Sequence, residues 1–330
     1  MREFDYRRAP DVPGAVALLD DDPHARYLAG GTNLVDLMKS GVERPARLVD
    51  VRELPLDRIE PAADGGLRVG ATATNSDLAA HPEVRSHYPM LAQAVLAGAS
   101  GQLRNMATVG GNLLQRTRCA YFTDTTKPCN KREPGSGCPA ISGEHHNHAI
   151  LGASETCVAV HPSDMAVALT ALDAVLHYET AGGQGELPIG QLYLPVAETP
   201  HRETALPAGA LITGVSLPRV PVAARSRYRK VRERASYAFA IGSVAAALDI
   251  RDGVVHDARL AFGAVASRPW RARTAERLLI GAPATAETYA AAAEAELAAA
   301  RPLPHNGYKV TLMRNLTVAV LSELAEEAAR

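Results

Sequence analysis

The feature that most limits how this chain can fold is a stretch from Leu103 to Cys157 that lacks a hydrophobic pattern. It is rich in Pro, Gly, Lys, Asn and His, so it offers no apolar face for a core to bury. A segment of this length inside a compact protein is normally disordered or held by something other than a core. All four cysteines lie in it, with 9, 8 and 18 residues between them: Cys119, Cys129, Cys138 and Cys157.

Three chemistries can use four thiols in this way. Two disulfides would suit a secreted protein, but a chain of 330 residues is large enough not to need them. A structural zinc site usually shows closely spaced pairs of cysteines, which are absent here. An iron–sulfur cluster needs four thiolates and tolerates wider spacing. The spacing therefore favours a cluster and leaves zinc and disulfides as alternatives.

The same stretch contains the run Glu144-His145-His146-Asn147-His148. Histidines at this density can bind a metal ion. Because the run is polar and lies in a segment without apolar pattern, we expect it to be a solvated loop apex.

Composition and charge exclude several classes of function. A net charge of −1 gives no electrostatic case for binding nucleic acid or an anionic membrane. Aromatic residues make up 5% of the chain, which argues against stacked-base recognition. No apolar run is long enough to cross a bilayer. Residues 1–6 show neither a hydrophobic run nor a twin arginine, so we expect no export signal and a cytosolic protein.

A first glycine turn follows a predicted strand at residues 25–29. Gly30-Gly31-Thr32-Asn33 leads into helical spacing at Leu34, Val35, Leu37 and Met38. Glycines allow a ligand to approach the backbone, and amides at a helix start favour an anion such as a pyrophosphate. Alone, this motif fits a ligand loop and an ordinary capped turn equally well.

A second glycine turn, Thr108-Val109-Gly110-Gly111-Asn112, precedes the cysteines. Two Gly-Gly turns flanked by Thr and Asn are more informative than one, because a pair can hold the same phosphate group from two sides. The pair favours a phosphate-bearing ligand.

Apolar patterns predict the remaining elements. We expect helices at 12–19, 76–80 (capped by Asn75), 90–97, 165–172, 272–280, 284–300 and 310–329. We expect strands at 47–51, 67–74, 175–179, 187–189, 211–217, 243–250 and 254–265, with hairpin turns at 182–185 and 251–253.

Two polar features belong to no hydrophobic pattern. Asp164 precedes a predicted helix, where it either caps the helix or bonds a polar part of a nucleotide. A basic run occupies residues 225–234, and its alternating positions indicate one face of a strand beside an anionic ligand or a partner subunit.

Together these pieces resemble the FAD-binding subunit of the molybdenum hydroxylases, the superfamily of xanthine dehydrogenase and aldehyde oxidoreductase. The match is specific at residues 29–33, 104–112, 163–164 and 228–230 and spans nearly the whole chain. The cysteine stretch is similar to the insertion that carries a [4Fe–4S] cluster in bacterial aldehyde oxidoreductases and in 4-hydroxybenzoyl-CoA reductase. Cys119-Ala120-Tyr121-Phe122 and residues 151–154 are most similar to the aldehyde oxidoreductase type.

The resemblance implies an α+β chain with a two-subdomain FAD-binding fold of the vanillyl-alcohol-oxidase (PCMH) type. An α/β C-terminal domain of the CO dehydrogenase flavoprotein type would follow. The expected divisions are 1–62 for the first subdomain, 63–222 for the second with a [4Fe–4S] loop at 115–160, and 223–330 for the C-terminal domain.

The resemblance also implies the site residues. The first pyrophosphate loop would be formed by Arg26, Tyr27, Leu28, Ala29, Gly30, Gly31, Thr32, Asn33 and Leu34. The second would supply Thr108, Gly111 and Asn112. Asp164 would contact the ribose–phosphate region, and Ile212 and Lys230 would lie near the flavin ring, where a cation stabilises the anionic reduced flavin. The four cysteines would ligate the [4Fe–4S] cluster.

The implied function is electron transfer within a heterotrimer, with no catalytic side chain in this chain. A large molybdenum-cofactor subunit would oxidise an aldehyde, a small subunit would carry [2Fe–2S] clusters, and FAD here would pass the electrons to an external acceptor. A related molybdenum hydroxylase subunit, an autonomous flavin reductase and a zinc-stabilised scaffold are the alternatives. Relatives exported folded on a partner's signal make the periplasm a second possible compartment.

Overall fold

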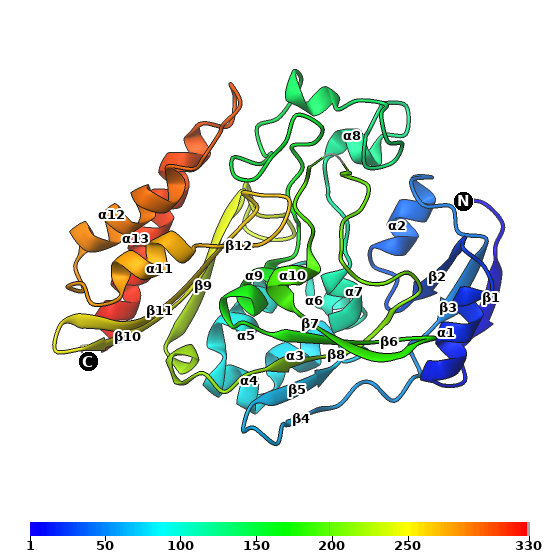
Figure 1. Cartoon of the computed structure of the whole chain (residues 1–330), viewed down its shortest axis with the longest axis horizontal. Coiled ribbons are helices and arrows are strands. Elements are labelled where there is room, and N and C mark those ends of the chain that lie inside the picture. Colours follow the sequence, from blue (N-terminus) through cyan, green and yellow to red (C-terminus); the bar gives the residue numbers. More distant parts are fainter. Residues whose placement is uncertain (198, 329–330) are drawn as a thin grey trace.

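The computed structural model describes residues 1–197 and 199–328, and its sheets follow one another along the chain (Figure 1). The first sheet is parallel, with the order β1 (Asp5–Arg8), β3 (Arg47–Asp50), β2 (Ala25–Leu28). Helix α1 (Val12–Asp20) is capped by Asp11, whose carboxylate accepts a hydrogen bond from the Gly14 amide at 2.7 Å. Helix α2 (Leu34–Lys39) follows the first glycine turn.

The second sheet is antiparallel and forms the middle of the molecule. Its order is β4 (Ile59–Pro61), β5 (Leu67–Gly70), β8 (Leu211–Leu217), β6 (Val175–Thr180), β7 (Gly183–Pro188). Its helices share one apolar core with β5, β6 and β8: α3 (Asn75–Ala80), α4 (Pro82–His87), α5 (Pro89–Ala97), α7 (Val109–Leu113), α9 (Asp164–Ala171) and α10 (Ile189–Leu192). Helix α6 (Gly101–Arg104) leads toward the second glycine turn. Thr74 caps α3 in place of the expected Asn75, because its hydroxyl accepts from the Asp77 amide.

The third sheet follows the short helix η2 (Pro221–Ala224) and is also antiparallel. Its order is β12 (Trp270–Arg271), β11 (Val254–Gly263), β10 (Gly242–Arg251), β9 (Ser226–Val231). Helices α11 (Arg273–Leu279), α12 (Ala286–Leu297) and α13 (Tyr308–Ala328) cover the outer face (Figure 1). Helices α5 and α9 contact the inner side of the sheet, so the third sheet closes one flank of the central unit. The last residue expected to be helical, Ala329, lies outside the described residues.

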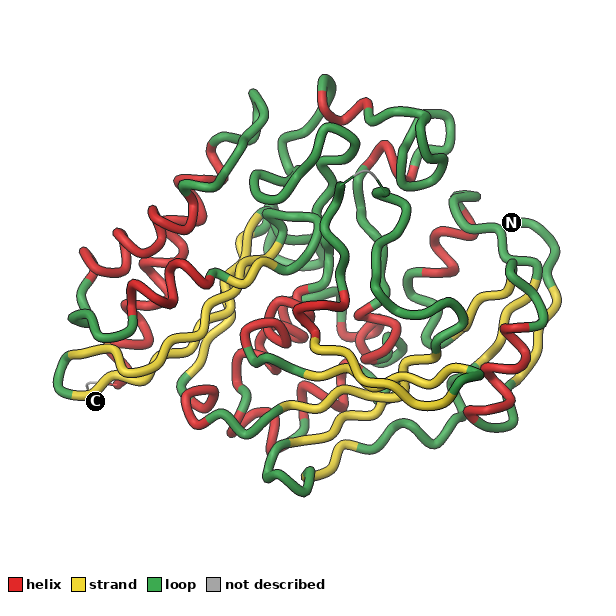
Figure 2. The backbone as a smooth tube through the Cα atoms, in the orientation of Figure 1, coloured by secondary structure: helices red, strands yellow, loops and turns green. Residues whose placement is uncertain are grey.

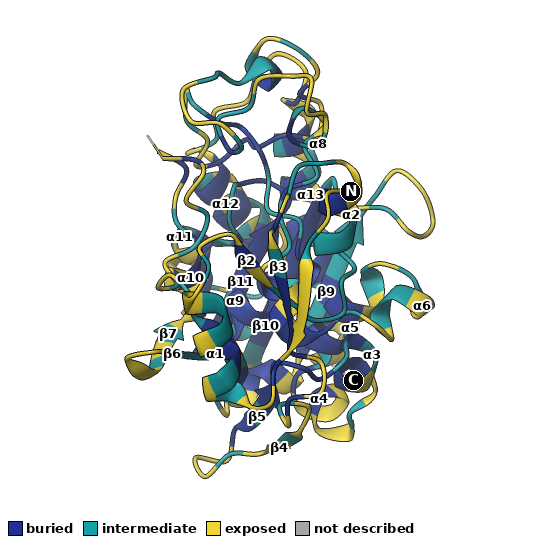
Figure 3. Cartoon of the chain, turned by 90° about the vertical axis from the view of Figure 1, so that its right-hand side faces the viewer, coloured by how far each residue is buried: buried dark blue, intermediate teal, exposed yellow. Residues whose placement is uncertain are grey.

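Residues 115–160, the cysteine loop, form an excursion that is almost entirely irregular (Figure 2), with α8 (Ala120–Thr123) and η1 (Pro139–Ile141) as its short helices. Exposed, half-buried and buried residues are mixed along it, whereas β10 is buried over most of its length (Figure 3). The expectation of a solvated apex at residues 144–148 is wrong for two histidines, because His145 and His148 are buried. The start of α13 holds this turn: Lys309 donates to the His148 carbonyl at 3.0 Å, and the His305 amide donates to the His145 ring.

The basic run on β9 divides between the two faces of the strand. Arg227 and Arg229 form ion pairs with Glu323 of α13, so this face of the strand lies against the C-terminal helix of the same chain. Lys230 points the opposite way, toward Asp164 at the start of α9. Within the described residues, no helix combines the length and apolar character needed to span a membrane.

Candidate functional site

The first glycine loop joins β2 to α2 and has free hydrogen-bond donors. No described residue accepts a hydrogen bond from the backbone amides of residues 30–34. Gly30 lies so close to the residues just before the second loop that a Cβ there would be 1.8 Å from the Met106 carbonyl oxygen. Gly31 has a φ of +71°, which favours glycine. The loop therefore presents a run of unpaired amides, and its backbone conformation requires glycine at positions 30 and 31.

The second glycine loop satisfies its own amides. The Thr108 hydroxyl accepts from the Gly111 amide at 3.2 Å, and the Asn112 amide donates to the Thr108 carbonyl. The amides of Val109 and Gly110 donate to carbonyls of Ala73 and Ala71. The Asn112 side-chain oxygen accepts from the hydroxyl of Ser163 and the side-chain amide of Gln115.

A cavity of about 280 Å³, which we call the Tyr27 cavity, lies between the first sheet and the second loop. Asn33 anchors its wall, because its Oδ1 accepts from the Arg116 amide at 2.9 Å while its buried Nδ2 has no partner among the described residues. Leu28 does not line the cavity; its carbonyl accepts from the Val51 amide in the sheet. The expected site residues on the wall are Arg26, Tyr27, Ala29, Gly30, Gly31, Thr32, Asn33, Leu34, Thr108, Gly111 and Ile212.

A second cavity of about 460 Å³, the Lys230 cavity, is lined by Thr32, Asn33, Gly111, Asn112, Asp164 and Lys230. Thr32, Asn33 and Gly111 also line the Tyr27 cavity, so the two cavities meet at the glycine loops. Ile212 and Lys230 lie in different cavities, so the structure does not bring together the two residues expected near the flavin ring.

Lys230 and Asp164 form a buried ion pair with 2.8 Å between Nζ and Oδ2. The Tyr228 hydroxyl donates to the other Asp164 oxygen, and Lys230 also donates to the Ala97 carbonyl. Burial and the adjacent Asp164 charge raise the pKa of Tyr228 well above its usual value, so the phenol stays protonated and remains a donor. Asp164 is not the cap of α9, since the Ser163 hydroxyl accepts from the Ala166 amide.

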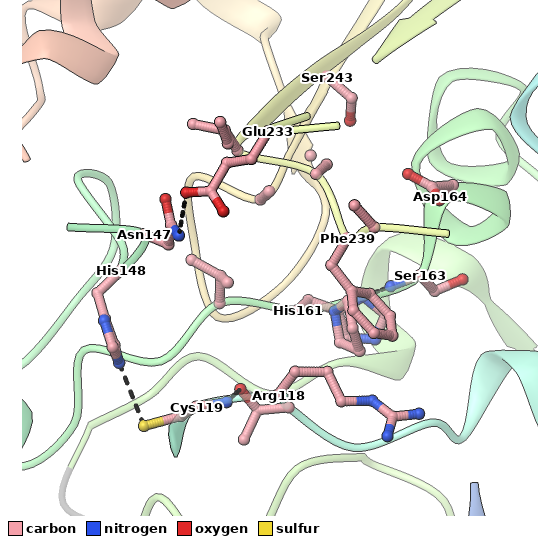
Figure 4. Close-up of a pocket in the computed structure, with 18 of the residues that line it drawn as sticks. Arg118, Cys119, Asn147, His148, His161, Ser163, Asp164, Glu233, Phe239 and Ser243 are labelled. Atoms are coloured by element: carbon pink, nitrogen blue, oxygen red, sulfur yellow. Dashed lines mark hydrogen bonds between the residues drawn. The ribbon is translucent and has the colours of Figure 1, made fainter. Parts of the chain in front are cut away.

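A third cavity of about 420 Å³, the His148 cavity, extends from Asp164 to Cys119 (Figure 4). It shares Arg118, Asp164 and Phe239 with the Lys230 cavity. The Arg118 guanidinium lies 4.9 Å from the Phe239 ring centroid, and its buried Nε has no partner among the described residues. The His148 Nε2 lies 3.1 Å from the Cys119 sulfur. No spacing or periodicity in the sequence marks Arg118 or Phe239, because the fold alone brings residues 118 and 239 together.

The four cysteines form no disulfide and together line one small cavity, the cysteine cavity. Two hydrogen bonds close the loop around it: the Asn130 side chain donates to the Thr156 carbonyl, and the Cys129 amide donates to the Ser136 hydroxyl. Among the described residues, no three His, Cys, Asp or Glu side chains are arranged to hold a single metal ion.

These features fit an elongated dinucleotide. Unpaired amides suit the diphosphate, since a row of N–H donors without acceptors attracts an anion. The Tyr27 and Lys230 cavities extend from that point in two directions and offer space for the two ends of the molecule.

Comparisons with known proteins agree with this geometry. The family described as FAD binding domain in molybdopterin dehydrogenase matches residues 2–220, and the CO dehydrogenase flavoprotein C-terminal domain matches residues 226–324. The chain is 48% identical over 330 residues to the aldehyde oxidoreductase FAD-binding subunit PaoB of Escherichia coli (strain K12), covering 99% of this chain and 100% of that protein.

More distant relatives share the architecture. The putative xanthine dehydrogenase FAD-binding subunit XdhB of Escherichia coli (strain K12) is 27% identical, covering 98% of this chain and 96% of that protein. The structure of quinoline 2-oxidoreductase from Pseudomonas putida 86 matches with a TM-score of 0.78 at 25% identity, over 100% of this chain and 99% of that one. The expected fold, an FAD-binding domain followed by a CO dehydrogenase flavoprotein C-terminal domain, is confirmed. The chain belongs to the FAD-binding medium subunits of the molybdenum hydroxylases, a family of oxidoreductase complexes.

Proposed function

We propose that the chain is the FAD- and [4Fe–4S]-carrying electron-transfer subunit of a molybdenum-dependent aldehyde oxidoreductase. The observation that carries the substrate class is the 48% identity, over nearly the full length of both chains, to a subunit named for aldehyde oxidation. The xanthine dehydrogenase subunit XdhB and quinoline 2-oxidoreductase are less similar to this chain and are named for other substrates.

We further propose that the FAD diphosphate binds the free amides of residues 30–34. Thr108, Gly111 and Asn112 would form the opposite wall, with Gly111 at the junction of the two cavities. Arg26, Tyr27, Ala29 and Ile212 would enclose one end of the cofactor, and Asp164 and Lys230 the other. Bound FAD supplies the redox chemistry, while the Lys230–Asp164 pair places a fixed, nearly neutral dipole beside it.

The cluster proposal depends on the convergence of the four thiols on one cavity. Convergence of cysteines 119, 129, 138 and 157 from a loop without a core of its own is what thiolate ligation requires. Zinc is the competing occupant, and iron with acid-labile sulfide distinguishes the two.

The partners we propose are a large molybdenum-cofactor subunit and a small [2Fe–2S] subunit, with electrons leaving this chain for an external acceptor. Cofactor insertion would take place in the cytosol, whether or not the assembled complex is exported afterwards.

Two measurements on the anaerobically purified complex test these proposals. The visible spectrum with iron and sulfide analysis should give one FAD and one [4Fe–4S] cluster per chain, in addition to the [2Fe–2S] iron of the small subunit. Addition of an aldehyde should bleach the flavin band. A flavin that stays oxidised with aldehyde would contradict the electron-transfer role, and zinc in place of iron would contradict the cluster.

A further inference from the structure

A network of ion pairs connects the first glycine loop to the cysteine loop. Arg116 lies at its centre and pairs with Glu43 through Nη1 and with Glu203 through Nε, the latter at 2.8 Å. Glu203 uses its other oxygen to bind Lys131 of the cysteine loop, also at 2.8 Å. Arg26, beside the first glycine loop, lies 3.8 Å from Glu43.

The central residues of this ion-pair network are largely buried. The side chains of Arg116, Glu203 and Lys131 are 20%, 25% and 6% exposed. Burial alone would raise the pKa of Glu203, but the charges of Arg116 and Lys131 outweigh it and hold that pKa below its usual value. Ion pairs shielded in this way are costly to break singly, because each loss leaves a buried charge unpaired.

Arg116 contacts both candidate cofactor regions directly. Its backbone amide donates to Asn33 Oδ1 in the first glycine loop, and its side chain lines the Tyr27 cavity. Its guanidinium also lies 4.5 Å from the ring centroid of Phe122, a fully buried residue of the cysteine loop. At the far end of the ion-pair network, Lys131 lines the cysteine cavity together with the four thiols.

We propose that Arg116 and Glu203 are positioning residues that couple FAD binding to occupancy of the cysteine cavity. The inference rests on the proposed function, since it assumes that the cysteines hold a cluster. A cluster would fix the loop that carries Phe122 and Lys131. Phe122 contacts Arg116 directly, and Lys131 holds it through Glu203. Arg116 in turn fixes Asn33 beside the free amides. Such coupling is reciprocal, so FAD would also favour retention of the cluster.

A purely local role is the rival explanation. If Arg116 only supports the first glycine loop, its loss weakens FAD binding by the same factor whether or not the cluster is present. If it carries the coupling, the effect of the cluster on FAD binding disappears with it. A double cycle separates the two, because it measures the interaction between changes rather than their sizes.

The cycle uses the full-length chain, purified anaerobically and freed of flavin. FAD affinity is measured from the quenching of flavin fluorescence, before and after iron is removed by oxidation and chelation. Iron removal should raise the Kd for FAD about tenfold in the wild-type chain. In Arg116→Met, iron removal should change that Kd by less than about twofold.

Three further variants serve as an alternative, a conservative replacement and a control. Glu203→Gln weakens the ion-pair network at the residue that joins Arg116 to Lys131, so it should also abolish the effect of iron removal on the Kd for FAD. This variant keeps the proposal testable if Arg116→Met folds poorly. Arg116→Lys keeps the charge but cannot hold two carboxylates at once, so it should retain only part of the effect. Arg314→Met removes an Arg–Glu pair between α12 and α13, 2.6 Å in length, and should leave the tenfold effect intact.

The outcomes are distinct. An equal iron effect in wild type, Arg116→Met and Glu203→Gln, or no iron effect in wild type, overturns the coupling while leaving both cofactors assigned. A wild-type chain that binds FAD but carries no iron overturns the cluster assignment and this inference with it.

Discussion

The two glycine loops have similar sequences but use their backbones differently. In the first, the amides of residues 30–34 have no acceptor among the described residues. In the second, Thr108 and carbonyls of Ala71 and Ala73 take up the amides of Val109, Gly110, Gly111 and Asn112. The first loop is therefore the one equipped to bind an anion, and the second provides a rigid wall. A shared Gly-Gly motif does not establish a shared role.

The largest expected effect comes from Gly30→Ala. Its new Cβ would be 1.8 Å from the Met106 carbonyl oxygen, so the loops must separate. We expect a loss of about 3 kcal/mol in the free energy of unfolding, together with loss of bound FAD. Chemical denaturation and flavin content measure both. Gly101→Ala, where a Cβ meets nothing within 4 Å, is the matched control. Retained flavin in Gly30→Ala would show that the loops need not touch.

A second test places a negative charge in each loop. Asn33→Asp keeps the acceptor for the Arg116 amide but sets a carboxylate beside the free amides. We expect FAD affinity to fall about tenfold or more, since like charges in a binding site are costly. Asn112→Asp should cost less, because the hydroxyl of Ser163 and the side-chain amide of Gln115 already bind that oxygen. Equal losses of FAD affinity in the two variants would remove the distinction between the loops.

Thr108→Val tests the internal bonding of the second loop. The change removes the hydroxyl that accepts from the Gly111 amide. We expect the free energy of unfolding to fall by about 1 kcal/mol, the usual value of a helix N-cap, with little change in FAD affinity. Thr108→Ser should restore the stability. A large loss of FAD affinity in a stable Thr108→Val protein would show that this hydroxyl binds the cofactor instead.

The smallest expected effect comes from Gly111→Ala. A Cβ there would lie 3.1 Å from the Thr108 hydroxyl oxygen and 4.0 Å from the Ala29 Cβ. Alanine stabilises a helix relative to glycine, and this should offset the tight contact. The free energy of unfolding, measured by thermal denaturation, should therefore change by less than about 1 kcal/mol. A loss as large as that of Gly30→Ala would mean that the second loop needs its glycine as much as the first.

Periodicity and turn chemistry predicted most of the elements but few of their partners. Strands such as β10 and β11 and helices such as α5 follow apolar patterns that are local in the sequence. The burial of His145 and His148 was missed, because their partners, His305 and Lys309, follow more than 150 residues later.

The expected site residues came from the resemblance and not from a local pattern in the sequence. The Lys230–Asp164 pair joins positions 66 apart in sequence that no local signal connects. Arg116 belongs to no motif, yet it contacts Asn33 of the first glycine loop and Phe122 of the cysteine loop. Its charged partners, Glu43 and Glu203, come from segments distant in the sequence. The free amides of the first loop are likewise a property of the folded backbone, which a Gly-Gly turn permits but does not specify.

The most direct test of the account is amide hydrogen exchange of the full-length chain with and without FAD. We predict that residues 30–34 exchange rapidly in the flavin-free chain and slow at least about tenfold when FAD binds. Residues 109–112 should be protected in both states. FAD-dependent protection confined to residues 109–112, with residues 30–34 unchanged, would contradict the claim that the first loop binds the diphosphate.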